Sequence, residues 1–409
     1  MWQSKFRSLF GRPPEVSFNK LPNVYKNRKK ILEILKNNST PLFLVDNKIL
    51  GNRLKDLIAA PKTNWGNFKI AYSFKTNYEI AKLNLLKKNG LWAEVVSGRE
   101  YQMAKKLGYK GSEIIFNGPL KTDDDLKTAL GEGALIFIDN FEELRRIKTI
   151  AKSQKKKFQI GIRIRSKILT LNQSRFGFLV ENGEATRAAK FIEQDPLLNL
   201  VGLHTHIGTD VDSPASYKKA AKDMANLIKA EIPNYENKIK YLDFGGGFPA
   251  SGLPPYGKKN WKPRSLNTYV EVVAGELKNV FKSKNPTLVL EPGRYLVDDA
   301  VLFITNITDY KDSLPGQILT TDATITMLPL IHYRPQVVKL YDKNLFEKQS
   351  LFVDSIVYGA SCREEDVLYK NRLPKAETGN LLIYYITGAY NQNMASEFIF
   401  KKPNFYTLD

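Results

Sequence analysis

The sequence predicts an α/β protein in which a (β/α)8 barrel precedes a smaller antiparallel β-domain. From residue 40 to about residue 297, a short apolar run, a turn and an amphipathic stretch follow one another repeatedly. About eight such units in about 250 residues are typical of a closed parallel barrel. After residue 300 the runs are short, β-branched and aromatic, without helical connectors, which indicates antiparallel strands. A length of 409 residues accommodates both parts.

The elements follow in chain order. Residues 1–40 are ambiguous and are expected to join the β-domain, to which they could add a strand. The barrel domain is predicted over residues 41–297 and the C-terminal β-domain over 298–409. Barrel strands are expected at 41–46, 68–74, 91–96, 114–118, 135–139, 158–164, 200–208, 240–246 and 287–293, with helices such as 98–108 and 123–133 between them. Strands of the β-domain are expected at 301–310, 317–327, 336–342, 349–359 and 380–390.

Composition limits the location and partners of the protein. The single cysteine excludes intramolecular disulfides and indicates a reducing compartment. The basic start MWQSKFRSLFGRPPEV lacks the apolar core of a signal peptide, and no run approaches the roughly 18 apolar residues of a membrane-spanning helix. We therefore expect a soluble, cytoplasmic protein with no membrane partner.

The net charge of +20 raises the question of nucleic-acid binding. However, the 46 lysines and 16 arginines are spread along the whole chain, and their denser clusters fall on expected helix surfaces and loops. We interpret most of them as solvated surface and expect no nucleic-acid partner. The alternative is a basic field that attracts an acidic small substrate.

In such a barrel the active site lies at the C-terminal ends of the strands. Lys75 directly follows the predicted strand IAYSF, where desolvation favours a free amine suited to Schiff-base chemistry. The structural alternative is a lysine whose stem packs at the strand end while its ammonium reaches water.

Three further strand ends carry polar or glycine-rich motifs. HTHIG (204–208) places two histidines on alternate positions, but no nearby cysteine or acid cluster completes a metal site, so we expect no metal. A flat imidazole that stacks on a planar ring is the better functional interpretation. GGG at 245–247 either approaches a phosphate closely or forms only a turn. LEPGRYLV (290–297) offers Glu291 to a protonated ring nitrogen and Arg294 to a phosphate.

Taken in order, these motifs resemble the fold-type III pyridoxal-phosphate-dependent decarboxylases, which include ornithine, diaminopimelate and arginine decarboxylases. The resemblance spans TPLFLVD (40–46) to GAYNQNM (388–394) and implies an alanine-racemase-like fold. It rests on the order of Lys75, His206, Gly245, Gly246, Gly247, Glu291, Arg294, Cys362 and Tyr390.

The resemblance implies pyridoxal 5'-phosphate as the cofactor. It implies that Lys75 binds the cofactor covalently, that His206 stacks on its ring and that Glu291 pairs with its ring nitrogen. The residues implied to hold the phosphate or lie near it are Thr209, Gly245, Gly246, Gly247, Gly293, Arg294 and Tyr390. Glu94, Glu100 and Arg163 match residues that surround the cofactor. A carboxylate at the ring nitrogen favours the protonated ring and therefore loss of CO2, whereas racemase-like relatives carry an arginine there.

The single cysteine lies in the charged stretch YGASCREEDVLY (358–369). By itself Cys362 is either a catalytic thiol or a chance residue on a solvated turn. The resemblance implies that the matching cysteine crosses a dimer interface and protonates the substrate carbon after CO2 leaves. It therefore implies a homodimer with shared active sites, with Lys75 and Cys362 as the catalytic residues.

One residue departs from the family pattern. Members that act on basic amino acids carry an acid directly after this cysteine, where it meets the distal amine of the substrate. Here that position is Arg363, which repels an ammonium group and attracts a carboxylate. Asp366 preserves the later part of the motif. Both are therefore predicted to bind substrate.

The predicted function is decarboxylation of an amino acid or amino-acid conjugate with an anionic or conjugated distal end, for example a siderophore or secondary-metabolite intermediate. Two alternatives remain within the same fold. One is an amino-acid racemase or epimerase, and the other is a non-catalytic regulator, which would have no use for Lys75 and Cys362.

Overall fold

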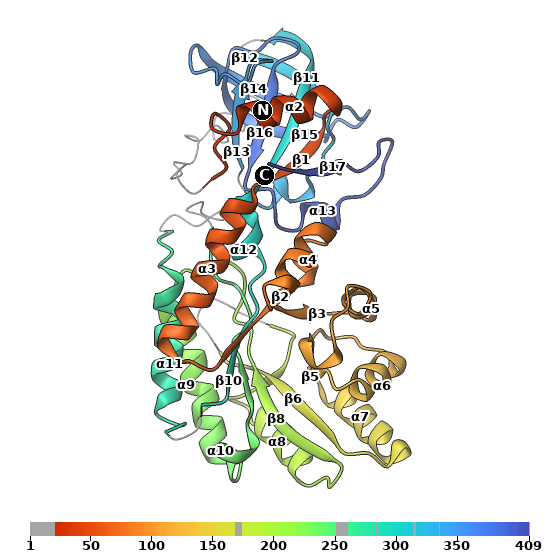
Figure 1. Ribbon diagram of the computed structural model, residues 1–409, viewed down its shortest axis with the longest axis vertical. Coiled ribbons are helices and arrows are strands. Elements are labelled where there is room, and N and C mark those ends of the chain that lie inside the picture. The colour runs from red at the N-terminus through yellow and green to blue at the C-terminus, as the bar shows by residue number, and fades with distance from the viewer. Residues whose placement is uncertain are drawn as a thin grey trace, which may run out of the picture. The chain divides into compact units, whose positions relative to one another are not determined.

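The computed structural model describes residues 21–167, 174–250, 261–282, 285–313, 316–334 and 336–408. The chain divides into two compact units (Figure 1). The barrel unit comprises Leu54–Pro249 and Lys262–Gly293. The β unit comprises Met1–Arg53, Ala250–Trp261 and Arg294–Asp409, as far as these ranges are described. Both ends of the barrel unit lie inside the range 41–297 predicted for the barrel domain. No helix in the described ranges has the length and apolarity needed to cross a membrane.

The barrel unit holds a nine-stranded sheet in which all strand pairs are parallel. Its order is β5-β4-β3-β2-β10-β9-β8-β6-β7, and the additional pairing of β5 with β6 closes a ring that leaves only β7 outside. The predicted (β/α)8 barrel is therefore confirmed. The strands are β2 (Phe68–Ser73), β3 (Trp92–Val95), β4 (Ile114–Phe116), β5 (Leu135–Ile138), β6 (Phe158–Arg165), β7 (Phe178–Leu179), β8 (Leu198–His204), β9 (Tyr241–Asp243) and β10 (Thr287–Leu290).

Helices follow the strands around the barrel (Figure 1). They are α3 (Asn47–Asn64), which begins in the β unit, α4 (Ile80–Lys88), α5 (Gly98–Lys106), α6 (Asp123–Gly131), α7 (Phe141–Gln154), α8 (Glu184–Glu193), α9 (Pro214–Glu231), α10 (Tyr235–Lys238) and α11 (Leu266–Lys278), with short 3-10 turns η2 (Phe74–Thr76) and η3 (Gly111–Glu113). Ser97, Thr122 and Asn140 cap α5, α6 and α7 by accepting a backbone N–H three residues further on.

The interior of the barrel is packed around Phe137 on β5. Its ring is buried together with Ala71, Ile115 and Val289 from neighbouring strands. Gly161 supplies the space, since a Cβ there would lie 2.3 Å from the Phe137 ring. The chemistry is therefore confined to the ends of the strands, because side chains fill the middle of the barrel.

The β unit has a mixed sheet. Its strands are β1 (Leu42–Val45), β11 (Val301–Ser313), β12 (Gly316–Thr321), β13 (Val337–Tyr341), β14 (Phe352–Tyr358), β15 (Val367–Pro374), β16 (Leu381–Tyr385) and β17 (Asn404–Thr407). Most pairs are antiparallel, but β1–β17 and β12–β14 are parallel. The predicted antiparallel β-domain is therefore confirmed as a mixed, mostly antiparallel sheet. The short helices are α12 (Arg294–Val297), η4 (Asp298–Ala300), η5 (Pro329–His332) and α13 (Asn391–Met394).

The strand expected at 41–46 as the first of the barrel belongs to the β unit. β1 pairs antiparallel with β11 and parallel with β17. All four of its residues are buried. An apolar run that is buried on both faces fits the centre of either sheet, so its composition does not reveal which strands it joins.

Residues 21–40 contain a single helix, α2, and residues 1–20 lie outside the described residues. In α2 (Arg28–Asn37), Ile31 and Ile34 are buried one turn apart and pack with Leu302 and Ile304 of β11. The possible strand is therefore replaced, in this described part, by an amphipathic helix that completes the core of the β unit.

Candidate active site

The C-terminal ends of six barrel strands bring polar side chains to one end of the barrel. Parallel strands place these ends at the same edge, although the residues are far apart in sequence. The residues contributed there are Lys75 after β2, Glu94 on β3, Asn117 after β4, His204 and His206 at the end of β8, Asp243 on β9 and Glu291 after β10.

Lys75 lies in the 3-10 turn η2 and is held by a buried carboxylate. Its Nζ donates to Oε2 of Glu94 at 2.5 Å and to Oγ of Ser73 at 3.1 Å. The Ser73 hydroxyl donates to the same Glu94 oxygen. The Glu94 side chain is 1% exposed, whereas that of Lys75 is 36% exposed. The ion pair therefore orients the amine while leaving it accessible to a ligand.

Glu100 supports the loop that follows β3. One of its oxygens accepts the Val96 N–H at 2.8 Å, and the other accepts the Tyr78 hydroxyl. Burial raises the pKa of Glu100, and these two hydrogen bonds partly oppose that rise. Glu100 thus fixes backbone next to Glu94 rather than pairing with Lys75 itself.

Glu291 lies among buried polar groups. Its Oε1 accepts from Nδ2 of Asn117 at 2.6 Å, and its Oε2 lies 3.3 Å from Nε2 of His204. Burial alone raises the pKa of Glu291, but His204 and Lys75 lower it to about 2. Burial lowers the pKa of His204, so its ring is neutral near pH 7. Because a neutral His204 carries no charge, we attribute the ionised state of Glu291 to the Lys75 ammonium and to the hydrogen bonds that its carboxylate accepts, among them those from Asp243 and Asn117.

Asp243 connects this carboxylate to the glycine loop. Burial and the neighbouring Glu291 raise the pKa of Asp243 well above its ordinary value, which favours its protonated form. Its Oδ1 accepts the Gly245 N–H at 2.8 Å. His204, Asp243 and Glu291 offer ligand atoms within 4.8 Å of one another and thus form one buried polar cluster.

His206 lies just beyond the end of β8 and is oriented by the glycine loop. Its Nδ1 accepts the Gly246 N–H at 3.1 Å, so in the neutral ring the proton is on Nε2. Burial, together with Arg163 and Lys75, lowers the pKa of His206 to about 3. The residue as a whole is only partly buried, and its ring is a neutral, flat group at the barrel end.

The glycine loop needs glycine for close packing. A Cβ on Gly247, whose φ is +84°, would lie 2.1 Å from the Gly208 carbonyl oxygen, and a Cβ on Gly246 would lie 2.4 Å from that of Glu291. The amides of Gly245 and Gly246 already serve Asp243 and His206. Their part in the structure is therefore to orient those side chains, and a direct contact with phosphate stays a prediction.

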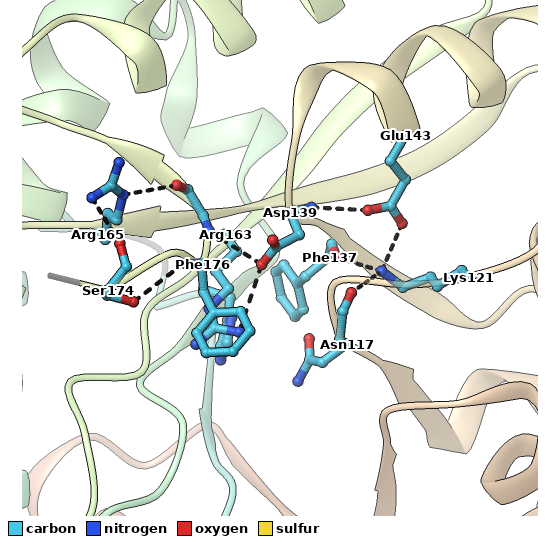
Figure 2. Close-up of polar contacts among 12 residues, drawn as sticks. Asn117, Lys121, Phe137, Asp139, Glu143, Arg163, Arg165, Ser174 and Phe176 are labelled. Atoms are coloured by element: carbon cyan, nitrogen blue, oxygen red, sulfur yellow. Dashed lines mark hydrogen bonds and ion pairs between the residues drawn. The ribbon is translucent and has the colours of Figure 1, made fainter.

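Arg163 at the end of β6 is held by residues that the sequence analysis did not identify (Figure 2). Its Nη1 lies 3.7 Å from Oδ1 of Asp139, and its guanidinium lies 4.8 Å from the centre of the Phe176 ring. Asp139 Oδ1 also accepts the Gly177 N–H at 3.1 Å. Burial lowers the pKa of Arg163, which nearby carboxylates oppose, and the guanidinium stays charged.

The remaining predicted residues of the barrel unit are Thr209, which is exposed, and Gly293. Gly293 is tightly packed, since a Cβ there would lie 2.1 Å from Oγ1 of Thr76. Arg294 and Tyr390 belong to the β unit. The Arg294 Nη1 pairs with Oδ2 of Asp298 at 2.8 Å, and its guanidinium lies 5.2 Å from the Tyr390 ring centre.

Cys362, Arg363 and Asp366 share the loop between β14 and β15 in the β unit. Cys362 and Arg363 are exposed. Asp366 is fully buried, and its carboxylate accepts N–H groups from Ile325 at 2.6 Å and Ser361 at 3.0 Å. In this structure Asp366 therefore shapes the loop that presents Cys362 and Arg363, and its contact with substrate stays a prediction.

Sequence reasoning missed Asn117, Asp139, Asp243 and Phe176. The first three lie within predicted strands, in their C-terminal parts, and that position was a usable signal for the chemistry of a barrel end. Phe176 had no such signal, because β7 is only two residues long.

Comparisons with known proteins show what this chain is similar to. The family model "Pyridoxal-dependent decarboxylase, pyridoxal binding domain" matches residues 52–298. Diaminopimelate decarboxylase of Archaeoglobus fulgidus is 27% identical over 382 residues, which cover 90% of this chain and 87% of that protein. The corresponding enzyme of Methanocaldococcus jannaschii is 29% identical over 384 residues, which cover 90% and 85%. A crystal structure of the M. jannaschii enzyme with L-lysine has a TM-score of 0.79 at 24% identity and covers 92% of this chain and 89% of that one.

Proposed function

This chain belongs to the pyridoxal-dependent decarboxylases, and from that premise we propose that its substrate is an amino acid, or an amino-acid conjugate, with an anionic distal end. The coarser function is that of a pyridoxal 5'-phosphate-dependent amino-acid decarboxylase. The relatives described above carry the name diaminopimelate decarboxylase, and they lend no support to the expected siderophore pathway.

The residues of the barrel end fit this cofactor. The accessible amine of Lys75 suits an aldehyde, and the ionised carboxylate of Glu291 suits a protonated ring nitrogen. The neutral ring of His206 suits stacking on a planar ring, because it carries no charge that would need solvation. When bound, pyridoxal phosphate withdraws the electron pair left on the substrate carbon as CO2 departs.

The protein residues supply binding, orientation and proton control. Glu94 orients the Lys75 amine, and Glu291 holds a proton at the ring nitrogen. An arginine would disfavour that proton, so the carboxylate argues against the racemase alternative. In this proposal Thr209, the glycine loop, Gly293, Arg294 and Tyr390 hold the phosphate. Presence of both Lys75 and Cys362 argues against a non-catalytic regulator.

The distal specificity rests on one observation, the exposed guanidinium that follows Cys362. Among the described residues, no carboxylate forms an ion pair with Arg363, the adjacent Glu364 and Glu365 included. An exposed arginine beside the proposed proton donor is available to a substrate carboxylate, and it repels an ammonium group. Diaminopimelate carries both groups at its distal end, so it is the first compound to test.

The first prediction concerns Arg363. Arg363→Ala should lower kcat/KM for the best acidic substrate about tenfold to a hundredfold, because a charge-assisted contact is lost. The visible absorbance of the bound cofactor should not change. Arg363→Asp should move the preference towards ornithine or lysine. CO2 release from diaminopimelate, acidic amino-acid conjugates, lysine and ornithine gives the comparison.

Arg372→Ala is the matched control. Arg372 is an exposed arginine of the same unit, on the neighbouring strand β15, and it pairs with Asp354. A wild-type preference for lysine, together with an unchanged kcat/KM in Arg363→Ala, would show that other residues recognise the distal end.

A further inference from the structure

Asn117 lies between the two carboxylates of the barrel end. Its Nδ2 donates to Oε1 of Glu291 at 2.6 Å and to Oε1 of Glu94 at 3.3 Å. Its side chain is buried, and it follows β4 at the C-terminal end of the barrel. One amide group therefore bonds to two carboxylates, one on β3 and one after β10, the strands on either side of β2.

The chemistry of the contacts fixes the orientation of this amide. The reversed orientation would place Oδ1 against two carboxylate oxygens, which have no proton to offer when ionised. In the observed orientation Oδ1 is buried without a hydrogen-bond partner among the described residues. A buried acceptor without a partner costs free energy. The two hydrogen bonds donated by Nδ2 must therefore contribute more free energy than this acceptor costs.

The two carboxylates have different partners. Glu94 holds the Lys75 amine through its other oxygen, and Glu291 faces His204 through its other oxygen. Buried like charges near each other favour protonation of one of them. Two N–H groups from a single amide counter this repulsion, and they also set the direction of each carboxylate.

The backbone around Asn117 is anchored (Figure 2). Lys121 is fully buried, and its Nζ donates to the Gly118 carbonyl at 2.8 Å and to the Phe137 carbonyl at 3.3 Å, and pairs with Glu143 at 2.6 Å. Gly118 has a φ of +92°, and a Cβ there would lie 2.7 Å from the Val96 carbonyl oxygen. The amide of Asn117 is thus presented from a fixed loop.

We propose that Asn117 is a positioning residue that keeps Glu291 ionised and aimed at the cofactor ring nitrogen, and that couples it to the Glu94–Lys75 pair. This inference rests on the proposed pairing of Glu291 with the ring nitrogen. Asn117 itself touches neither the substrate nor the reacting atoms in this proposal, and it acts through Glu291.

The test compares two cofactors that differ only at the ring nitrogen. Pyridoxal phosphate and 1-deazapyridoxal phosphate, which has a carbon at that position, are titrated into enzyme from which the cofactor has been removed. Tryptophan fluorescence gives the dissociation constants, so activity is not needed. Asn117→Ala should weaken binding of pyridoxal phosphate about tenfold or more, and should change binding of the deaza analogue less than about twofold.

One further variant distinguishes failure of this inference from failure of the proposed function. Glu291→Gln should give the same selective loss, and its absence would overturn the proposed pairing with the ring nitrogen. Selective loss in Glu291→Gln but not in Asn117→Ala would overturn the role of Asn117 alone. Equal weakening of both cofactors by Asn117→Ala would show a merely structural role.

Asn67→Ala is the matched control, because Asn67 precedes β2 at the opposite end of the barrel and donates its side-chain amide to the Asn285 carbonyl at 2.9 Å. It should change neither dissociation constant. If Asn117→Ala does not fold, Asn117→Ser, which keeps a single shorter donor, is titrated instead. We expect Asn117→Ser to lose less affinity than Asn117→Ala, and only for pyridoxal phosphate. An equal loss of affinity for both cofactors would again overturn the inference.

Discussion

At the scale of single residues, the local environments in the site give neighbouring groups different protonation states. Glu291 is held ionised, Asp243 is favoured as a neutral acid and His206 is held neutral. Such separation is typical of sites that perform acid–base or cofactor chemistry. The neutral state of His206 also has a consequence for stability.

The second prediction, after that for Arg363, is a loss of stability on acidification. The pKa of His206 is about 3 in the folded protein and 6.5 in its ordinary environment. Above pH 6.5 neither state binds the proton. Below it the unfolded chain binds a proton that the folded chain excludes, so the free energy of unfolding falls as the pH falls towards 3. His206→Asn should weaken this pH dependence. Urea unfolding of cofactor-free protein across this range measures it.

In His206→Asn the free energy of unfolding should still depend on pH to some extent. Burial also lowers the pKa of His204, and this shift likewise makes the protein less stable as the pH falls. His332→Asn is the control, since His332 is exposed and lies in η5 of the β unit. Identical pH dependence in His206→Asn and His332→Asn would contradict a neutral His206 in the folded protein.

At the scale of elements, the site depends on contacts between neighbouring strand–helix units. Figure 2 shows Lys121, from the loop after β4, in contact with Glu143 of α7. Glu143 Oε2 also accepts the Asp139 N–H at 3.0 Å. This buried pair joins the segment that carries Asn117 to the segment that carries Asp139, and thereby to Arg163.

The third prediction is that Lys121→Met lowers the free energy of unfolding by about 3–5 kcal/mol, because it leaves the Glu143 charge buried and unpaired. Lys121→Met combined with Glu143→Gln should recover most of the loss, since the amide oxygen still accepts the Asp139 N–H. Urea denaturation of the three proteins measures these values.

Lys127→Met provides the comparison. Lys127 lies 3.6 Å from Asp124 on α6, and both side chains are more than half exposed. Removal of this exposed pair should cost less than about 1 kcal/mol. A similar cost for Lys121→Met would mean that the buried pair contributes little to holding the loop.

At the scale of the whole molecule, the two residues that we propose as catalytic belong to different units. Lys75 belongs to the barrel unit, whereas Cys362 is exposed on the β unit. An exposed thiol is available to a second subunit, which supports the proposed homodimer with shared active sites.

The fourth prediction is complementation between inactive chains. Lys75→Ala and Cys362→Ala should each be inactive, and an equal mixture after subunit exchange should recover about a quarter of the wild-type activity. Half of the dimers are then mixed, and each mixed dimer holds one intact site of two. Activity is followed as CO2 release, and exchange is confirmed with differently tagged chains. No recovery after confirmed exchange would mean that a single chain builds each site.

The sequence alone determined the type of most elements and the position of the main site residues. Periodicity distinguished the helices from the strands, and the predicted barrel strands from 68–74 onward correspond to observed strands. Lys75, Glu291 and His206 were predicted to lie at strand ends, and they do; parallel strands all end at the same side of a barrel, so this placement is readable from local sequence.

Only the tertiary structure decided which strands pair and which polar groups meet. The run at 41–46 is apolar enough for either sheet, and contacts with β11 and β17 assign it to the β unit. Asn117 and Glu291 are 174 residues apart, and no local pattern encodes their hydrogen bond. Local propensity acts over a few residues, whereas sheet partners and buried hydrogen bonds depend on how the whole chain closes around its core.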